Sequence, residues 1–158
     1  MKKKGYFEYR NDIYPRRLWV MVEAYKELVE ENFLDSDGKP LQYGDKEGFD
    51  GRTFSNVVSK DGRYFGNLVI FPSKKCMTMG VICHEAFHVL SALNDSLGLE
   101  WYNNGLNEHQ AYLIGWIGSC INKARLGIGE FVDIAKEETG RRWKNEDKTS
   151  KEDMEAKG

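Results

Sequence analysis

The order of apolar and polar positions divides the first third of the chain into a strand, a helix and a loop. Aromatic and polar residues mix across residues 6–14 ahead of Pro15, which favours an extended strand or arm. Apolar residues then recur at spacings of four and three with charged residues on the other faces, which predicts an amphipathic helix; its stripe is Leu18, Val22, Tyr25, Val29 and Phe33. Residues 35–51 are polar and glycine-rich without either period, so we expect a loop.

A hairpin and two helices are predicted after that loop. Residues 53–59 and 64–71 are rich in β-branched and aromatic side chains, and an Asp-Gly turn signal separates them. The nearly continuous apolar stretch 76–93 predicts a buried helix, and residues 106–124 predict a second helix after a loop. A short amphipathic piece, residues 131–136, ends the patterned part of the chain.

Length and composition indicate one domain, and the predicted strands and helices together are typical of the α+β class. The chain has 158 residues, 41% of them hydrophobic and 30% charged, and we place a single domain at residues 1–140. Residues 141–158 form a polar tail with both signs of charge, which we expect to be disordered. A formal net charge of -2 argues against a nucleic-acid partner. No apolar run resembles a membrane span or a secretory core, so we expect a cytoplasmic protein without a membrane partner.

The three cysteines carry no evident chemistry. Cys76, Cys83 and Cys120 contain no C-x-x-C pair, so they fit neither a disulfide framework nor a thiolate zinc site. We expect buried, reduced thiols that pack as small apolar residues.

The pentapeptide His84-Glu85-Ala86-Phe87-His88 lies inside the predicted buried helix. Residues four apart on a helix project from one face, so the two imidazoles can converge on one tetrahedral metal ion. Glu85 then flanks the ion, where its carboxylate can take a proton from activated water and pass it to a leaving amine. The alternative is a packed histidine pair beside a solvated Glu85, although unpaired titratable groups in an apolar helix cost several kcal/mol.

A catalytic zinc usually has three protein ligands, so one more is required. Glu108 follows His88 by twenty residues, at the start of the second predicted helix. This spacing resembles that of the gluzincins, the thermolysin-like zinc peptidases with H-E-x-x-H and a glutamate ligand in an Asn-Glu-x-x-x-Asp motif on the next helix. The resemblance covers residues 76–124 and implies one Zn²⁺ per chain, held by His84, His88 and Glu108, with Glu85 as general base. Glu108 could instead complement the helix dipole.

The motif around Glu108 departs from the family pattern at its last position. Tyr112 replaces the aspartate that in the family orients a ligand histidine. Its hydroxyl could accept a hydrogen bond from an imidazole N–H, or act catalytically by donating one to the oxyanion of the tetrahedral intermediate. The alternative is that Tyr112 packs between the two helices. Asn107 is expected to support the ligands without touching the metal. His109 could be a ligand, a transition-state donor or a solvent-exposed neighbour.

The strand before the active-site helix is a candidate substrate site. In zincin folds an edge strand beside that helix binds substrate as an added strand. Residues 66–71 could be this edge, with Asn67, Leu68 and Val69 binding substrate; the alternative is an interior strand.

The resemblance therefore implies a minimal zincin-like fold. A small antiparallel or mixed β-sheet would pack on the N-terminal amphipathic helix, the H-E-x-x-H helix and the ligand-bearing helix. The expected function is a zinc metallopeptidase acting on a peptide or protein, with zinc favoured over cobalt, manganese or iron because two histidines and one carboxylate are its usual hydrolytic set. Size adds a second resemblance, to short H-E-x-x-H proteins of phage and prophage genomes. The alternatives are a binding or assembly protein that keeps the fold without hydrolysis, and a peptidase dedicated to one partner protein.

Overall fold

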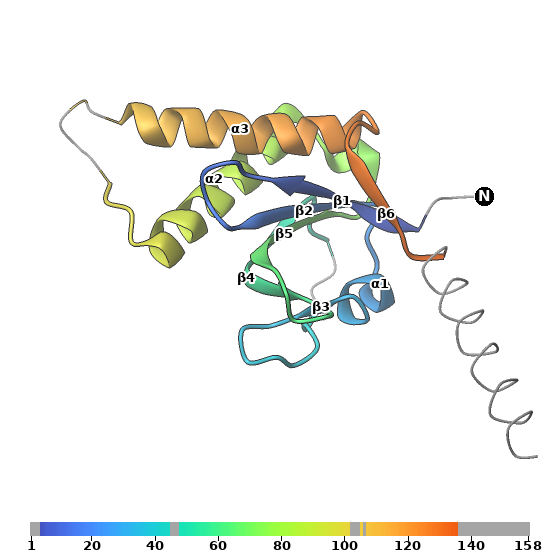
Figure 1. Ribbon diagram of the computed structural model, residues 1–158. Helices are drawn as coiled ribbons and strands as arrows, with labels where there is room; N and C mark the ends of the chain where they lie inside the picture. Colours follow the sequence, from blue (N-terminus) through green and yellow to red (C-terminus); the bar gives the residue numbers. More distant parts are fainter. Residues whose placement is uncertain (1–3, 45–47, 102–104, 106, 136–158) are drawn as a thin grey trace, which may run out of the picture.

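The computed structural model describes residues 4–44, 48–101, 105 and 107–135 (Figure 1). Its described part is a mixed α+β fold, as the predicted strands and helices indicated, built on one six-stranded sheet with strand order β3-β4-β5-β2-β1-β6. The strands are β1 (Gly5–Arg10), β2 (Arg17–Val22), β3 (Phe33–Leu34), β4 (Arg52–Ser59), β5 (Phe65–Phe71) and β6 (Glu130–Asp133). The helices are α1 (Lys26–Glu30), α2 (Met79–Leu97) and α3 (Glu108–Arg125), with a 3-10 turn at Lys74–Cys76. None of the helices in these ranges combines the length and apolar character that crossing a membrane requires.

The parallel pairing of β2 with β5 joins the two halves of the sheet. Every other named pair is antiparallel, namely β3 with β4, β4 with β5, β1 with β2, and β1 with β6. Glycine is required at Gly66 in the central pair, because a Cβ atom there would overlap the Arg17 carbonyl group. The residues between β2 and β5 make the crossover, which contains α1, β3 and β4.

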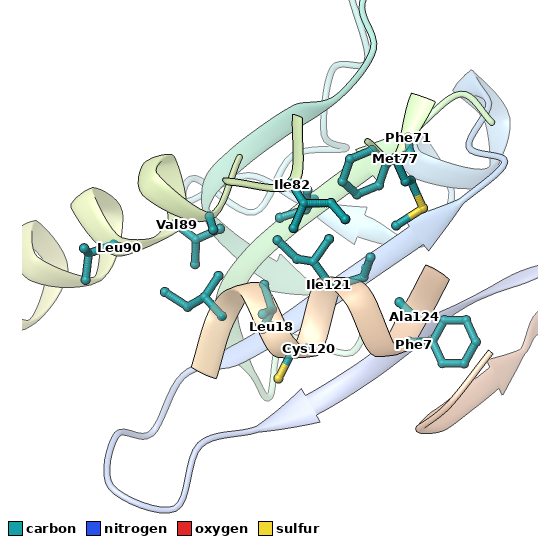
Figure 2. Packing of buried hydrophobic residues seen from close by; sticks show 14 of the residues in the cluster. Phe7, Leu18, Phe71, Met77, Ile82, Val89, Leu90, Cys120, Ile121 and Ala124 are labelled. Atoms are coloured by element: carbon teal, nitrogen blue, oxygen red, sulfur yellow. The ribbon is translucent and has the colours of Figure 1, made fainter. Parts of the chain in front are cut away.

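Both faces of the central strands are buried. Leu18 and Val20 of β2 belong to the core cluster that packs against α2 and α3, part of which Figure 2 shows. Trp19 and Met21 point to the opposite face, where they pack with Leu28 of α1 and other residues of a second cluster. Figure 1 shows the consequence, since α2 and α3 cover one face of the sheet and α1 lies on the other.

The N-terminal amphipathic helix predicted over Leu18 to Phe33 is wrong. Arg17–Val22 is the strand β2, and only Lys26–Glu30 is helical. Because β2 has helices on both sides, four of its residues in succession are buried, and such a run carries no alternation that would reveal a strand.

The other predicted elements are confirmed with shifted ends. The hairpin is β4 and β5, and the two later helices are α2 and α3. Thr78 caps α2 by accepting a hydrogen bond from the Val81 backbone N–H, and Gly98 ends the helix with a left-handed φ of 64°. The amphipathic piece after α3 begins as β6, which pairs with β1. The tail at residues 141–158 and the domain boundary at residue 140 lie outside the described residues.

Candidate metal centre

Helix α2 presents two imidazole rings on an exposed face. The Nε2 atoms of His84 and His88 are 3.1 Å apart, and their rings are nearly perpendicular at 78°. Two nitrogen ligands on a tetrahedral zinc, each at about 2.0–2.1 Å from the metal, lie about 3.3 Å apart. The distance between the two nitrogen atoms therefore suits two ligands of one ion, and in the structure a ring N–H of one histidine donates a hydrogen bond to the ring nitrogen of the other.

Glu85 lies between the two histidines in sequence and faces the sheet. Glu85 is only 4% exposed. Thr53 of β4 donates a hydrogen bond of 2.6 Å from Oγ1 to Glu85 Oε2. Gly51 leaves the space that the carboxylate stem occupies, since a Cβ atom at this position would lie 2.9 Å from Glu85 Cγ. The carboxylate is thus held from the side opposite to solvent.

An open cleft of about 390 Å³ separates α2 from the start of β4. The β4 wall carries hydroxyl and amide side chains, whereas the α2 wall carries both imidazoles and two carboxylates. The lining residues are Gly51, Arg52, Thr53, Ser55, Asn56, His84, Glu85, His88, Ser91, Ala92 and Asp95. The two imidazoles and the Glu85 carboxylate therefore line one cleft, which extends along α2 as far as Asp95.

The sheet edge beside α2 is β4. In the described part of the chain β3 pairs only with Val58 and Ser59, so no strand pairs with Arg52–Phe54 on the side away from β5. A bulge between Phe54 and Val57 ends the regular register, and Asn56 has a left-handed φ of 54°. The first residues of β4 are therefore the strand edge that a peptide could join.

Of the two alternatives for residues 66–71, the interior strand is confirmed and the edge strand is wrong. Strand β5 pairs with β4 on one side and with β2 on the other. Asn67, Leu68 and Val69 are 3%, 0% and 0% exposed, so they are interior residues. Strand β5 precedes α2 in the sequence, but the hairpin brings β4 to the sheet edge beside α2.

The structure does not bring Glu108 to the histidine pair. Among the described residues, which include Glu108, no three His, Cys, Asp or Glu side chains gather as a metal-binding group. Glu108 is exposed in the first turn of α3. In the same turn Gln110 donates a hydrogen bond of 2.7 Å from Nε2 to the carbonyl oxygen of Glu100, which follows α2. The ligand role of Glu108 stays a prediction.

The other predicted residues of this motif lie outside the cleft. Asn107 precedes α3 as its N-cap residue, and its side chain makes no capping hydrogen bond. Tyr112 is 77% exposed, so it does not pack between the helices. His109 is exposed, and its Nε2 lies 2.8 Å from the Tyr14 hydroxyl oxygen.

The expectation of buried thiols is confirmed at one cysteine and wrong at another. Cys120 lies in the core, Cys76 is half-buried and Cys83 is exposed on α2; all three are free. Burial raises the pKa of the Cys120 thiol to about 11.

Neither Thr53 nor Asp95 of the cleft was predicted from the sequence as a functional residue. Thr53 is 32 positions from Glu85, and nothing local to either residue indicates their contact. Asp95 could have been found, because His84, His88, Ser91 and Asp95 follow one helical stripe at spacings of four, three and four.

Comparison of the chain with protein-family models, with curated proteins and with solved structures finds no match. The function is therefore argued from the cleft and its side chains.

Proposed function

We propose that this protein is a zinc-dependent peptidase with a minimal zincin-like fold, in which His84 and His88 hold the metal and Glu85 is the general base. The observation that carries the proposal is the 3.1 Å approach of the two Nε2 atoms on a helix face that shares its cleft with the Glu85 carboxylate. A packed histidine pair would have no need of an open cleft, a neighbouring buried carboxylate and an unpaired strand edge.

The residues of the cleft supply the steps that peptide hydrolysis requires. Zinc, when bound, supplies a Lewis acid that polarises the scissile carbonyl and acidifies water. Glu85 takes the proton of the attacking water and passes it to the leaving amine, while the Thr53 hydroxyl fixes the carboxylate orientation. The free edge of β4 would hold an extended substrate through main-chain hydrogen bonds.

We assign the third metal ligand to Glu108, on its spacing from His88 alone. Asn107 and Tyr112 enter the proposal with it, Asn107 as support for the ligands and Tyr112 as a donor to the oxyanion. Replacement of Glu108 by Gln should therefore lower the zinc content of the purified protein without changing its fold. Equal zinc in this variant and in the wild type would remove Glu108 from the ligand set.

The decisive activity experiment uses Glu85→Gln, which keeps the shape of the side chain and removes its basicity. The wild type should hydrolyse members of a quenched-fluorescent peptide library, and the variant should lose about 10²-fold or more in kcat/KM at unchanged zinc content. Glu31→Gln, at an exposed position at the end of α1, serves as the matched control and should keep full activity. Equal activity of Glu85→Gln and wild type would contradict the assignment.

A second candidate is a binding or assembly protein that retains a metal without hydrolysis. It is favoured by the fact that, within the described ranges, no third acidic, histidine or cysteine side chain joins His84 and His88. Zinc bound by the wild type together with an absence of hydrolysis across the library would favour this candidate.

A further inference from the structure

Four polar side chains form a single stripe along α2. His84, His88, Ser91 and Asp95 repeat at helical spacing, and all four line the cleft. The first two belong to the candidate metal site, whereas Asp95 lies almost two turns beyond His88. Its side chain is exposed, and within the described residues no hydrogen bond or ion pair engages its carboxylate.

The two walls of the cleft run side by side over the same length. Gly51 lies against Val81 and Glu85, and the cleft ends at Asn56 on one wall and Asp95 on the other. The five steps from Gly51 to Asn56 advance about 16 Å along an extended strand, and the ten steps from Glu85, which lies against Gly51, to Asp95 advance about 15 Å along the helix. A peptide lying along β4 therefore passes the histidine pair and reaches the end of α2 that carries Asp95.

The position of Asp95 corresponds to a definite distance along such a peptide. Seven helical residues separate it from His88, which is about 10 Å. An extended peptide advances about 3.3 Å per residue, so Asp95 faces a substrate residue about three positions from the bond at the metal. The bulge of β4 interrupts the regular strand after Phe54, so β4 offers a peptide no regular main-chain pairing beyond this residue. At the Asp95 end of the cleft a substrate must therefore be held by side chains.

Among the described charged side chains that line the cleft, Asp95 is the one to which neither the proposed reaction nor a structural contact assigns a role. The other charged residues of the lining are Glu85, which accepts from Thr53, and Arg52. The Arg52 guanidinium donates to the Tyr43 carbonyl and lies over the Phe49 ring at 4.2 Å, among residues of the second core cluster. A free carboxylate at the end of a substrate groove is complementary to a cation.

We propose that Asp95 is a specificity-determining residue that selects peptides with a Lys or Arg side chain about three residues from the scissile bond. The inference rests on the proposed peptidase function and names its substrate class. Ser91, between His88 and Asp95 on the stripe, contributes a hydroxyl to the same stretch of the groove.

The test is a lysine scan in short peptides with blocked termini, which removes the terminal charges. Binding is measured by fluorescence anisotropy with the zinc-loaded Glu85→Gln protein, and hydrolysis of the same peptides by the wild type locates the scissile bond. The peptide with lysine about three residues from that bond should bind about fivefold more tightly than its glutamine counterpart. Asp95→Asn should abolish this difference, and Asp95→Lys should transfer the preference to glutamate. Asp12→Asn, an exposed aspartate outside the cleft, is the matched control and should keep the lysine preference.

The outcomes separate this inference from the function on which it rests. Hydrolysis with no lysine preference, or a preference that survives Asp95→Asn, overturns the role of Asp95 and leaves the peptidase standing. Lysine-dependent binding that Asp95→Asn removes, without hydrolysis by the wild type, supports Asp95 and contradicts the peptidase. An absence of binding to every peptide overturns both.

Discussion

At the scale of single residues, the candidate site depends on a carboxylate that is almost fully buried. Glu85 is 4% exposed, and burial of a carboxyl group is costly unless hydrogen bonds satisfy its polar atoms. The Thr53 hydroxyl, 2.6 Å from Oε2, is the side-chain donor that the structure provides. Thr53 therefore stabilises the fold and holds the proposed base at the same time.

Replacing Thr53 by Val should cost about 1–3 kcal/mol of unfolding free energy, because it leaves the buried carboxylate without this donor. Thr53→Ser keeps the hydroxyl and is the control, with a smaller loss from the missing methyl group. Urea denaturation of the two variants measures the difference. Equal stability of Val and Ser at this position would show that the hydrogen bond contributes nothing.

The cysteines provide an independent check on burial. At pH 8 Cys83 should react rapidly with a disulfide reagent, whereas Cys120 should stay unreactive in the folded protein because it is buried and its pKa is raised to about 11. Since the folded pKa lies above the ordinary value, folding favours the protonated thiol, and this contribution to stability declines as pH rises from about 9 towards 11. Cys83→Ser should remove the fast phase; a fast phase that persists in this variant would contradict the arrangement.

The relative position of side chains within one helix could be predicted from the sequence, whereas contacts between side chains of different elements could not. The four-residue spacing of His84 and His88 determines that they share a face wherever the helix packs. The contact of Thr53 with Glu85 depends on how the hairpin folds onto α2, which no local pattern in either segment encodes.

At the scale of elements, β2 shows why an apolar stripe can mislead. Leu18 and Val22 match a helical period, but Trp19, Val20 and Met21 between them are buried as well. A run that is apolar at every position fits a strand covered on both faces better than a one-sided helix. The parallel pairing with β5 that creates this burial comes from a segment far along the chain.

The close approach of β4 to α2 can be tested at Gly51. A Cβ atom there would lie 2.9 Å from Glu85 Cγ and 3.0 Å from Val81 Cγ1, so Gly51→Ala should cost about 1–3 kcal/mol of unfolding free energy. If Glu85 is the general base, as proposed, the variant should also hydrolyse peptides more slowly because Glu85 is displaced. Gly115→Ala in α3 is the control, because no atom beyond its own helix lies within 4 Å and a helical alanine should add about 0.5–1 kcal/mol. Denaturant unfolding of both variants is the measurement, and an unchanged Gly51→Ala protein would contradict the packing.

At the scale of the whole molecule, the sheet and helices leave one side of α2 open. Val89 and Leu90 of α2 pack in the core with residues of α3 and the sheet (Figure 2). The face of α2 that carries the two histidines borders the cleft. The mixed α+β class, the hairpin and both long helices followed from the sequence pattern. Strand order did not, because it depends on pairings between distant segments. For the same reason the sequence did not reveal that the first residues of β4, and not those of β5, form the sheet edge beside α2.

The central claim is that His84 and His88 hold a metal ion. The most direct test is elemental mass spectrometry of the protein purified without added metal, with His88→Ala measured beside the wild type. We predict about one zinc per chain in the wild type and much less in the variant. A wild-type protein that contains no metal, and takes up none when zinc is offered, would contradict the account and leave the histidine pair as a packing feature of α2.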